Sequence, residues 1–272
     1  MAKPKCIVMP FREANASGIG LSLHFLLGNV IAVHTGFAEC WFGWRVGKIF
    51  RSSENLSDYI RMQCAAIDRK KMSAEQKIRC WIFGQMEGEA VRLSLFDRGK
   101  SAQAAPESFT FTVRDDLIGF RKQFIEWLGR CGLPMENHRR PMALWPERTS
   151  LLGLLRLGQA LRYFYIHSAY GGQSRIDLAL FETAVNAAPE SFMANNLCGW
   201  AHYRHQDARS AGRFFDRALA LNPNSPGVTA GRMGCAILEK DVEASVHWAV
   251  RKADLLEQDV AAAAGKARKR FE

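Results

Sequence analysis

The sequence lacks the cysteine spacings that build disulfide frameworks. None of its seven cysteines stands in a C-x-x-C pair, and all seven lie among apolar residues. A chain of 272 residues is long enough to bury a core of its own, so it needs no disulfide staples. We therefore expect reduced thiols and a cytoplasmic location. The cysteines are Cys6, Cys40, Cys64, Cys80, Cys131, Cys198 and Cys235.

Long apolar runs are also missing. The longest stretch without a charged residue, Ala14–Ala38, is interrupted by His24, Asn29 and several glycines, which would fall in the middle of a membrane span. The basic start MAKPK is followed by only a few apolar residues before Arg12, which is too short for a signal peptide. We expect no membrane span.

Motifs for catalysis and cofactor binding are absent too. The chain has no G-x-x-x-x-G-K-[ST] phosphate loop, no G-x-S-x-G nucleophile elbow, no H-E-x-x-H and no kinase signature. Gly18-Ile19-Gly20 follows an apolar strand as a dinucleotide fingerprint would, but Leu23 stands where the third glycine belongs. We therefore expect neither an enzyme nor a bound cofactor.

The turn at residues 18–20 has a structural explanation that needs no ligand. Asn15 and Ser17 favour local turns between side chain and backbone, and Ser17 or Ser22 can cap the first amides of the following helix. The two glycines supply backbone freedom.

One helix carries Cys198, His202 and His205, a spacing that can place zinc ligands on a shared face. Against this, Cys198 and His202 fall at positions that pack against neighbouring helices, and no fourth ligand is close in sequence. We favour a buried thiol and a packed imidazole, and expect no metal site.

The net charge of +10 arises mostly in the first half and in the tail. Residues 1–131 carry 19 Lys and Arg against 13 Asp and Glu, whereas residues 151–257 carry 11 against 10. A thinly spread excess is typical of a solvated surface, but it leaves nucleic-acid binding through the first half as an alternative. Only WFGWR at residues 41–45 interleaves aromatic and basic residues as that alternative would require.

Strand-like and helix-like patterns alternate in the first half, which predicts a mixed αβ domain at residues 1–131. MEGE between two apolar runs predicts a β-hairpin, and Asp115 or Asp116 is expected to cap the last helix. The proline-rich stretch 132–150 is expected to be a linker. We expect strands at 6–11, 37–44, 78–85, 90–97 and 108–113, and helices at 21–33, 55–67 and 117–128.

From residue 151 onward the pattern is helical and repeats. Small and aromatic residues recur with a period of 34, and a proline follows each pair of helices. The small residues allow the two antiparallel helices of a pair to approach closely. Residues 151–257 therefore resemble three tetratricopeptide (TPR) repeats. The residues that recur are Phe181 and Phe215, Ala184 and Ala218, and Pro189 and Pro223.

The outer copies deviate from this pattern, as terminal repeats often do. The first copy begins with a helix at about 151–169 that is longer than the repeat consensus. The Ala-rich stretch 258–272 is expected to form a capping helix with a basic tail. The third copy is displaced by one residue and is marked by Gly234, Val246, Val250 and Ala253.

Five short motifs mark the segment 1–131: P-F at 10–11, N-A-S-G at 15–18, G-L-S at 20–22, V-R-L at 91–93 and F-D at 96–97. With these motifs the segment resembles the TolB amino-terminal-like domains that precede TPR arrays in bacterial regulatory proteins. The resemblance implies an α+β fold, with a mixed αβ recognition domain followed by an all-α TPR array, and a regulatory rather than catalytic role. In such relatives the pair follows a winged-helix DNA-binding domain or a nucleotide cyclase.

In a TPR array the first helix of each pair lines a concave groove. An amide, two aromatic rings and two guanidinium groups in that groove suit an extended peptide that bears a carboxylate or an acidic side chain. The alternative is that the amino-terminal domain or the carboxy-terminal helix buries this stripe. The predicted groove residues are Arg162, Met193, Asn196, Trp200, Tyr203 and Arg204.

These observations predict a non-catalytic adaptor that binds protein or peptide partners through its TPR groove. The family resemblance favours an alternative, a regulatory module of a transcription or cyclase signalling system. Direct nucleic-acid binding is a second alternative.

Overall fold

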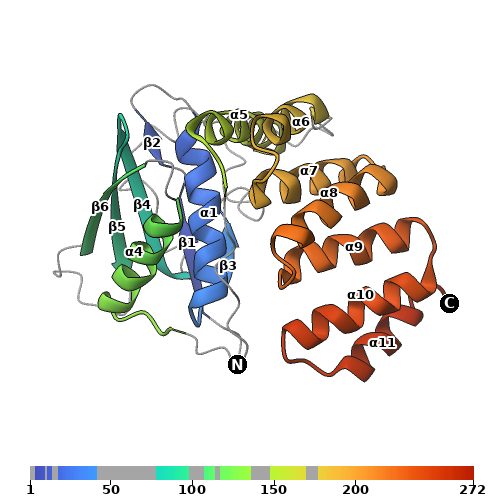
Figure 1. The fold of residues 1–272 in the computed structure, drawn as a ribbon. Helices are drawn as coiled ribbons and strands as arrows, with labels where there is room; N and C mark the ends of the chain where they lie inside the picture. The colour runs from blue at the N-terminus through green and yellow to red at the C-terminus, as the bar shows by residue number, and fades with distance from the viewer. Residues whose placement is uncertain are drawn as a thin grey trace. The chain divides into compact units, whose positions relative to one another are not determined.

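The structure is a computed structural model, described for residues 4–9, 11–13, 18–41, 78–97, 107–113, 117–135, 148–169 and 177–272. The chain has an α+β fold, with a β-sheet in its amino-terminal half and helices alone in the described part of its carboxy-terminal half (Figure 1). It divides into two compact units. The first comprises Met1–Pro141 and Leu154–Ser174, and the second comprises Met142–Gly153 and Arg175–Glu272.

One mixed sheet forms the centre of the first unit. Its strands lie in the order β3-β1-β4-β5-β6, and the short β2 pairs with β4 beyond the end of β1. The pairs β1–β3, β1–β4 and β2–β4 are parallel, whereas the pairs β4–β5 and β5–β6 are antiparallel. The strands are β1 Lys5–Val8, β2 Arg12–Glu13, β3 Ala38–Trp41, β4 Ile78–Glu87, β5 Ala90–Asp97 and β6 Glu107–Thr112.

Helix α1, Ile19–His34, connects the parallel strands β1 and β3. Its sequence is apolar on nearly every side, which is typical of a helix buried in the core rather than at the surface. Leu23, Leu26, Leu27 and Val30 are all inaccessible to solvent. The helix predicted at 21–33 is confirmed.

The antiparallel part of the sheet packs against helix α4, Leu117–Arg130. The ring centroid of Phe120 lies 3.7 Å from that of Phe111 on β6, and the Trp127 ring stacks on Phe109 at 5.6 Å. Gly88 turns the β4–β5 hairpin with a φ of 62°, a left-handed conformation that glycine adopts without strain. The predicted hairpin, the strand at 108–113 and the helix after it are confirmed.

Other expectations for the first half are met in part. The strand expected at 6–11 ends at Val8, and within the described residues the one expected at 37–44 covers Ala38–Trp41. The helix expected at 55–67 and the cap at Asp115 or Asp116 lie outside the described residues.

Helix α5, Leu151–Ala169, has the bounds expected of the first repeat's leading helix. From Leu154 onward it belongs to the first unit, where the Ser22 hydroxyl of α1 donates a 2.6 Å hydrogen bond to the Leu154 carbonyl. This differs from the domain boundary expected at residue 151.

The described helices of the second unit recur at a fixed spacing along the chain. Ser191, Ser225 and Asp259 stand at equal intervals in the sequence, and each accepts a hydrogen bond from a backbone N–H in the first turn of its helix. Asp207 and Asp241 repeat this arrangement for the second helix of each pair. The helices are α6 Leu178–Ala187, α7 Phe192–Arg204, α8 Ala208–Leu221, α9 Pro226–Leu238, α10 Val242–Leu255 and α11 Val260–Arg268.

Phe215 of α8 is the central core residue of this unit. It is inaccessible to solvent, and its ring lies against Gly199 of α7 and Gly231 of α9, where a Cβ at either glycine would clash with it. Small residues on α7 and α9 thus allow three helices to approach one aromatic ring.

The third copy keeps the 34-residue spacing in its helix boundaries, so the displacement by one residue expected from the sequence is a wrong alignment. Ser245 takes the place of Ala211, and both are inaccessible to solvent. Ala249 takes the place of Phe215. The aromatic residue that marks the second copy is therefore absent from the third, which explains why the sequence pattern suggested a shift.

Candidate functional site

The turn before α1, which resembles a phosphate cradle in sequence, is occupied by a carboxylate of the chain itself. Glu13 accepts a hydrogen bond of 2.7 Å from the backbone N–H of Gly18 and another from that of Gly20. Negative charge at this end of a helix is favourable because the first N–H groups have no partner within the helix. Glu13 therefore caps α1, and neither expected serine cap is confirmed, because Ser22 bonds to Leu154 and Ser17 lies outside the described residues.

Helix α5 closes the same turn from another side. A Cβ at Gly158 would overlap the backbone of Gly18, so the backbones of α5 and of this turn approach each other closely. On the sheet side, a Cβ at Gly20 would meet Phe11 as well as Glu13. The backbone N–H groups of Gly18 and Gly20, which a dinucleotide phosphate would use, are bonded to Glu13.

Removing the Glu13 carboxylate should destabilise the first unit. We expect Glu13→Ala to lower the free energy of unfolding by about 1–2 kcal/mol, because it leaves two amides at the α1 terminus without their acceptor. Urea denaturation measures this loss. Glu89→Ala removes an exposed glutamate in the hairpin turn and is the control, with an expected change below about 0.5 kcal/mol. Equal effects of the two substitutions would contradict the capping role.

The structure separates the six predicted groove residues into three groups. Met193 is inaccessible to solvent and Asn196 is 5 % exposed, so both belong to the interior. Trp200 and Tyr203 are half-buried and Arg204 is exposed. Arg162 lies on α5, and its side chain is outside the described residues.

Trp200 and Tyr203 form one aromatic surface on α7. Their rings meet edge to face at 5.5 Å, and Trp200 also packs edge to face on Phe215 at 5.3 Å. The Tyr203 ring lies against Gly234 of α9, where a Cβ would clash. The two rings are held in place by the core, and Arg204 follows them on the same helix. We name Trp200, Tyr203 and Arg204 the α7 surface.

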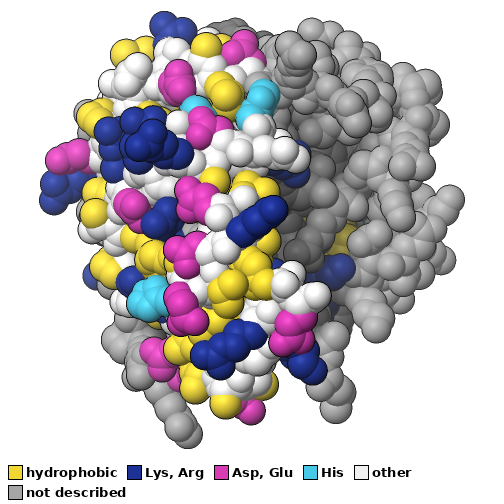
Figure 2. All heavy atoms as spheres, turned by 90° about the vertical axis from the view of Figure 1, so that its right-hand side faces the viewer, with side chains coloured by type: hydrophobic (Ala, Val, Ile, Leu, Met, Phe, Trp, Pro, Cys, Tyr) yellow, Lys and Arg dark blue, Asp and Glu magenta, His cyan; other side chains and the backbone are white. Residues whose placement is uncertain are grey.

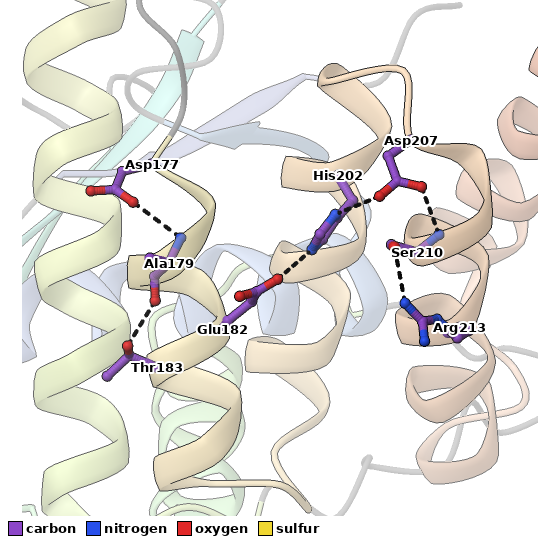
Figure 3. Close-up of polar contacts among 8 residues, drawn as sticks. All are labelled: Asp177, Ala179, Glu182, Thr183, His202, Asp207, Ser210 and Arg213. Atoms are coloured by element: carbon purple, nitrogen blue, oxygen red, sulfur yellow. Dashed lines mark hydrogen bonds and ion pairs between the residues drawn. The ribbon is translucent and has the colours of Figure 1, made fainter.

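A histidine links three helices beside this surface (Figure 3). His202 of α7 is buried and lies between two carboxylates, with 3.1 Å from its Nε2 to Oε1 of Glu182 and 3.3 Å from its Nδ1 to Oδ2 of Asp207. Its ring stacks on Phe214 of α8 at 5.2 Å. The backbone N–H and the side chain of Ser210 bond to Asp207 and, with His202, lower the pKa of this carboxyl group. Sequence patterns gave no signal for this network, because Glu182 lies on a different helix, far from His202 along the chain.

These contacts also account for the Cys198-x-x-x-His202 spacing. Cys198 is inaccessible to solvent, and burial raises the pKa of its thiol to about 12, which disfavours the thiolate that zinc binds. His202 faces the two carboxylates, whereas His205 is exposed. Within the described residues, no three His, Cys, Asp or Glu side chains are placed to hold a metal ion.

No protein-family model matches the chain, and no curated protein matches it. In the described part of the chain, every helix is too short or too polar to cross a lipid bilayer.

Proposed function

We propose that the chain is a non-catalytic adaptor whose carboxy-terminal helices are TPR repeats that bind a partner protein or peptide. The recurrence of helix caps at Ser191, Ser225 and Asp259 supports this assignment, since a 34-residue period of helix pairs is the TPR signature. Such repeats stack into extended surfaces that bind other chains.

The α7 surface carries the proposal. Trp200 and Tyr203 present rings that the core already holds in place, so a ligand that packs on them loses little side-chain entropy. Arg204 is an exposed residue whose guanidinium is partly desolvated, which lowers its pKa, and this group can hold a carboxylate through two hydrogen bonds. A partner segment with an apolar residue next to an acidic one fits this combination. Met193 and Asn196 would support the helix from within instead of touching the ligand.

For the first unit we propose a recognition domain of the TolB amino-terminal-like kind. Its β1-turn-α1 start and its β4–β5 hairpin carry the motifs of that resemblance. Because Glu13 occupies the α1 terminus, this domain would recognise its partner through another surface rather than through a nucleotide at the turn.

Charge reversal at Arg204 tests the proposed function. We expect the tagged chain to capture a defined set of proteins from its native host, and Arg204→Glu to reduce that capture at least about tenfold, since one buried ion pair lost and one repulsion gained together exceed about 1.4 kcal/mol. Trp200 is unsuitable for this test because it also packs on Phe215.

The matched control is Arg130→Glu, which reverses an exposed charge at the end of α4. Equal capture by the wild-type chain and both variants would contradict the α7 surface as the binding site. A DNA-binding protein or a cyclase among the partners lost with Arg204→Glu would favour the regulatory alternative.

A further inference from the structure

Helix α8 carries a row of arginines on its solvent side. Arg209, Arg213 and Arg217 are all exposed and follow one another at every fourth position. Each step of four residues advances about 6 Å along a helix and turns about 40° around it, so the three guanidinium groups share one face. This face lies opposite the buried side of α8, which includes Ala211, Phe215 and other core residues.

Within the described part of the chain, no carboxylate forms an ion pair with this arginine row. Arg213 donates a 3.0 Å hydrogen bond to the Ser210 hydroxyl, and the Arg217 guanidinium lies 5.6 Å from the centre of the Phe214 ring. In contrast, Arg232 of α9 makes an ion pair of 3.0 Å with Asp216. The three arginines thus keep most of their hydrogen-bond donors available to another molecule.

The repeat does not require arginines at these positions. One period later, on α10, the equivalent residues are Glu243, His247 and Arg251. One period earlier, on α6, Ala179 and Thr183 stand at the positions of Arg213 and Arg217. Helices α8 and α10 begin and end at equivalent positions, whereas α6 begins four residues later in the repeat and ends at the equivalent position. The arginine row therefore belongs to one copy and is not part of the repeat pattern.

We propose that the arginine row binds an acidic helical segment of a partner protein. A helix with glutamates at every fourth position repeats them at the same spacing, about 6 Å along its axis, so three carboxylates can meet three guanidinium groups in register. Each pair can form two parallel hydrogen bonds. The proposal adds a second binding surface and does not depend on the α7 surface.

The surroundings favour a carboxylate-bearing protein over a nucleic acid. Single-stranded nucleic acids need free aromatic faces on which bases stack, but Phe214 is already in contact with His202 and Arg217. The side of the molecule in Figure 2 also shows acidic side chains interspersed with basic ones over its described part, rather than a continuous basic field. Such a surface selects its partner by local spacing more than by long-range attraction.

A designed peptide tests the proposal on the full chain. The probe is a fluorescein-labelled, Ala-rich peptide of about 15 residues, near the length at which such helices form, with glutamates at positions i, i+4 and i+8. A second peptide has the same composition but distributes its glutamates around the helix. We expect fluorescence anisotropy at low salt to show that the first peptide binds at least about fivefold more tightly, because only its carboxylates share one face.

The key variant is the triple substitution of Arg209, Arg213 and Arg217 by Gln, a good helix former that keeps hydrogen-bonding capacity. Its matched control replaces Lys266, Lys269 and Arg270, all exposed, by Gln and lowers the net charge equally. We expect the arginine variant to weaken binding of the aligned peptide about tenfold or more and the control less than about twofold. Circular dichroism checks that both variants keep their helix content.

Three outcomes would overturn the proposal. Equal losses in the two triple variants would show that net charge alone attracts the peptide. Equal binding of the two peptides would show that the spacing is irrelevant. Tighter binding of a single-stranded RNA of matched charge, lost only in the arginine variant, would make the row a nucleic-acid surface. Arg204→Glu should leave peptide binding unchanged, which separates this test from that of the α7 surface.

Discussion

Phe215→Ala should lower the free energy of unfolding of the second unit by about 3–5 kcal/mol, which approaches the total stability of many domains. The Phe215 ring is inaccessible to solvent and contacts α7 at Gly199 and α9 at Gly231. Truncation removes the buried area and leaves a cavity that glycines cannot fill, because they have no side chains to move into it. Urea denaturation followed by circular dichroism measures the loss.

Phe214→Ala is the matched control, since it deletes the same atoms one position earlier on α8. Phe214 is half-buried and packs on His202 from the surface side, so we expect a loss of only about 1–2 kcal/mol. Phe215→Leu, which keeps most of the buried volume, should fall between the two. If Phe215→Ala cost no more than Phe214→Ala, the three-helix contact would not be the core of this unit.

His24 should make the first unit sensitive to acid well above the range in which carboxylates titrate. Burial lowers the pKa of His24 to about 4, although its hydrogen bond to the Leu21 carbonyl opposes the shift. In the unfolded chain the imidazole takes up a proton near pH 6.5. Between these values the unfolded state binds more protons, so the free energy of unfolding decreases as the pH falls, by roughly 3 kcal/mol in total.

His24→Leu should remove this part of the pH dependence. Urea denaturation at pH 7.5 and pH 4.5 gives the change in stability for each variant, and the wild-type chain should lose roughly 2–3 kcal/mol more than His24→Leu over this interval. His247→Leu is the control, because this histidine is exposed and its removal should leave the difference close to that of the wild type. The same acid-induced loss with and without His24 would contradict the assignment.

Local patterns predicted those elements whose sequence signals are short-range. The β4–β5 hairpin follows from a glycine turn between apolar runs, and α4 from its 3–4 spacing of apolar residues. Packing between distant residues was predicted less well. Asn196 and Met193 fall on the expected groove side of the repeat, yet both are buried. The position of a residue in the repeat predicts the direction in which its side chain leaves the helix axis. It does not predict which neighbouring residues bury that side chain, because these depend on how the helices pack.

The polar contacts divide in the same way. Serine and aspartate caps lie within one helical turn of the amides they accept from, so their positions can be read from the chain. The capping of α1 by Glu13, which precedes Gly18 by five residues, and the contact of His202 with Glu182 on another helix cannot be read in this way. Such pairs depend on how segments approach one another, which composition and spacing do not specify.

The amino-acid sequence alone determined the 34-residue period and the αβ character of the first half, because both follow from residue types at regular spacings along the chain. Only the tertiary structure decided that a glutamate fills the turn at Gly18 and Gly20, that α5 packs on α1, and that Trp200, Tyr203 and Arg204 remain at the surface while Met193 and Asn196 do not. The reason is physical: the hydrophobic effect is non-directional, so the sequence does not specify which partner an apolar side chain packs against. The packing of whole helices and strands decides which side chains are buried.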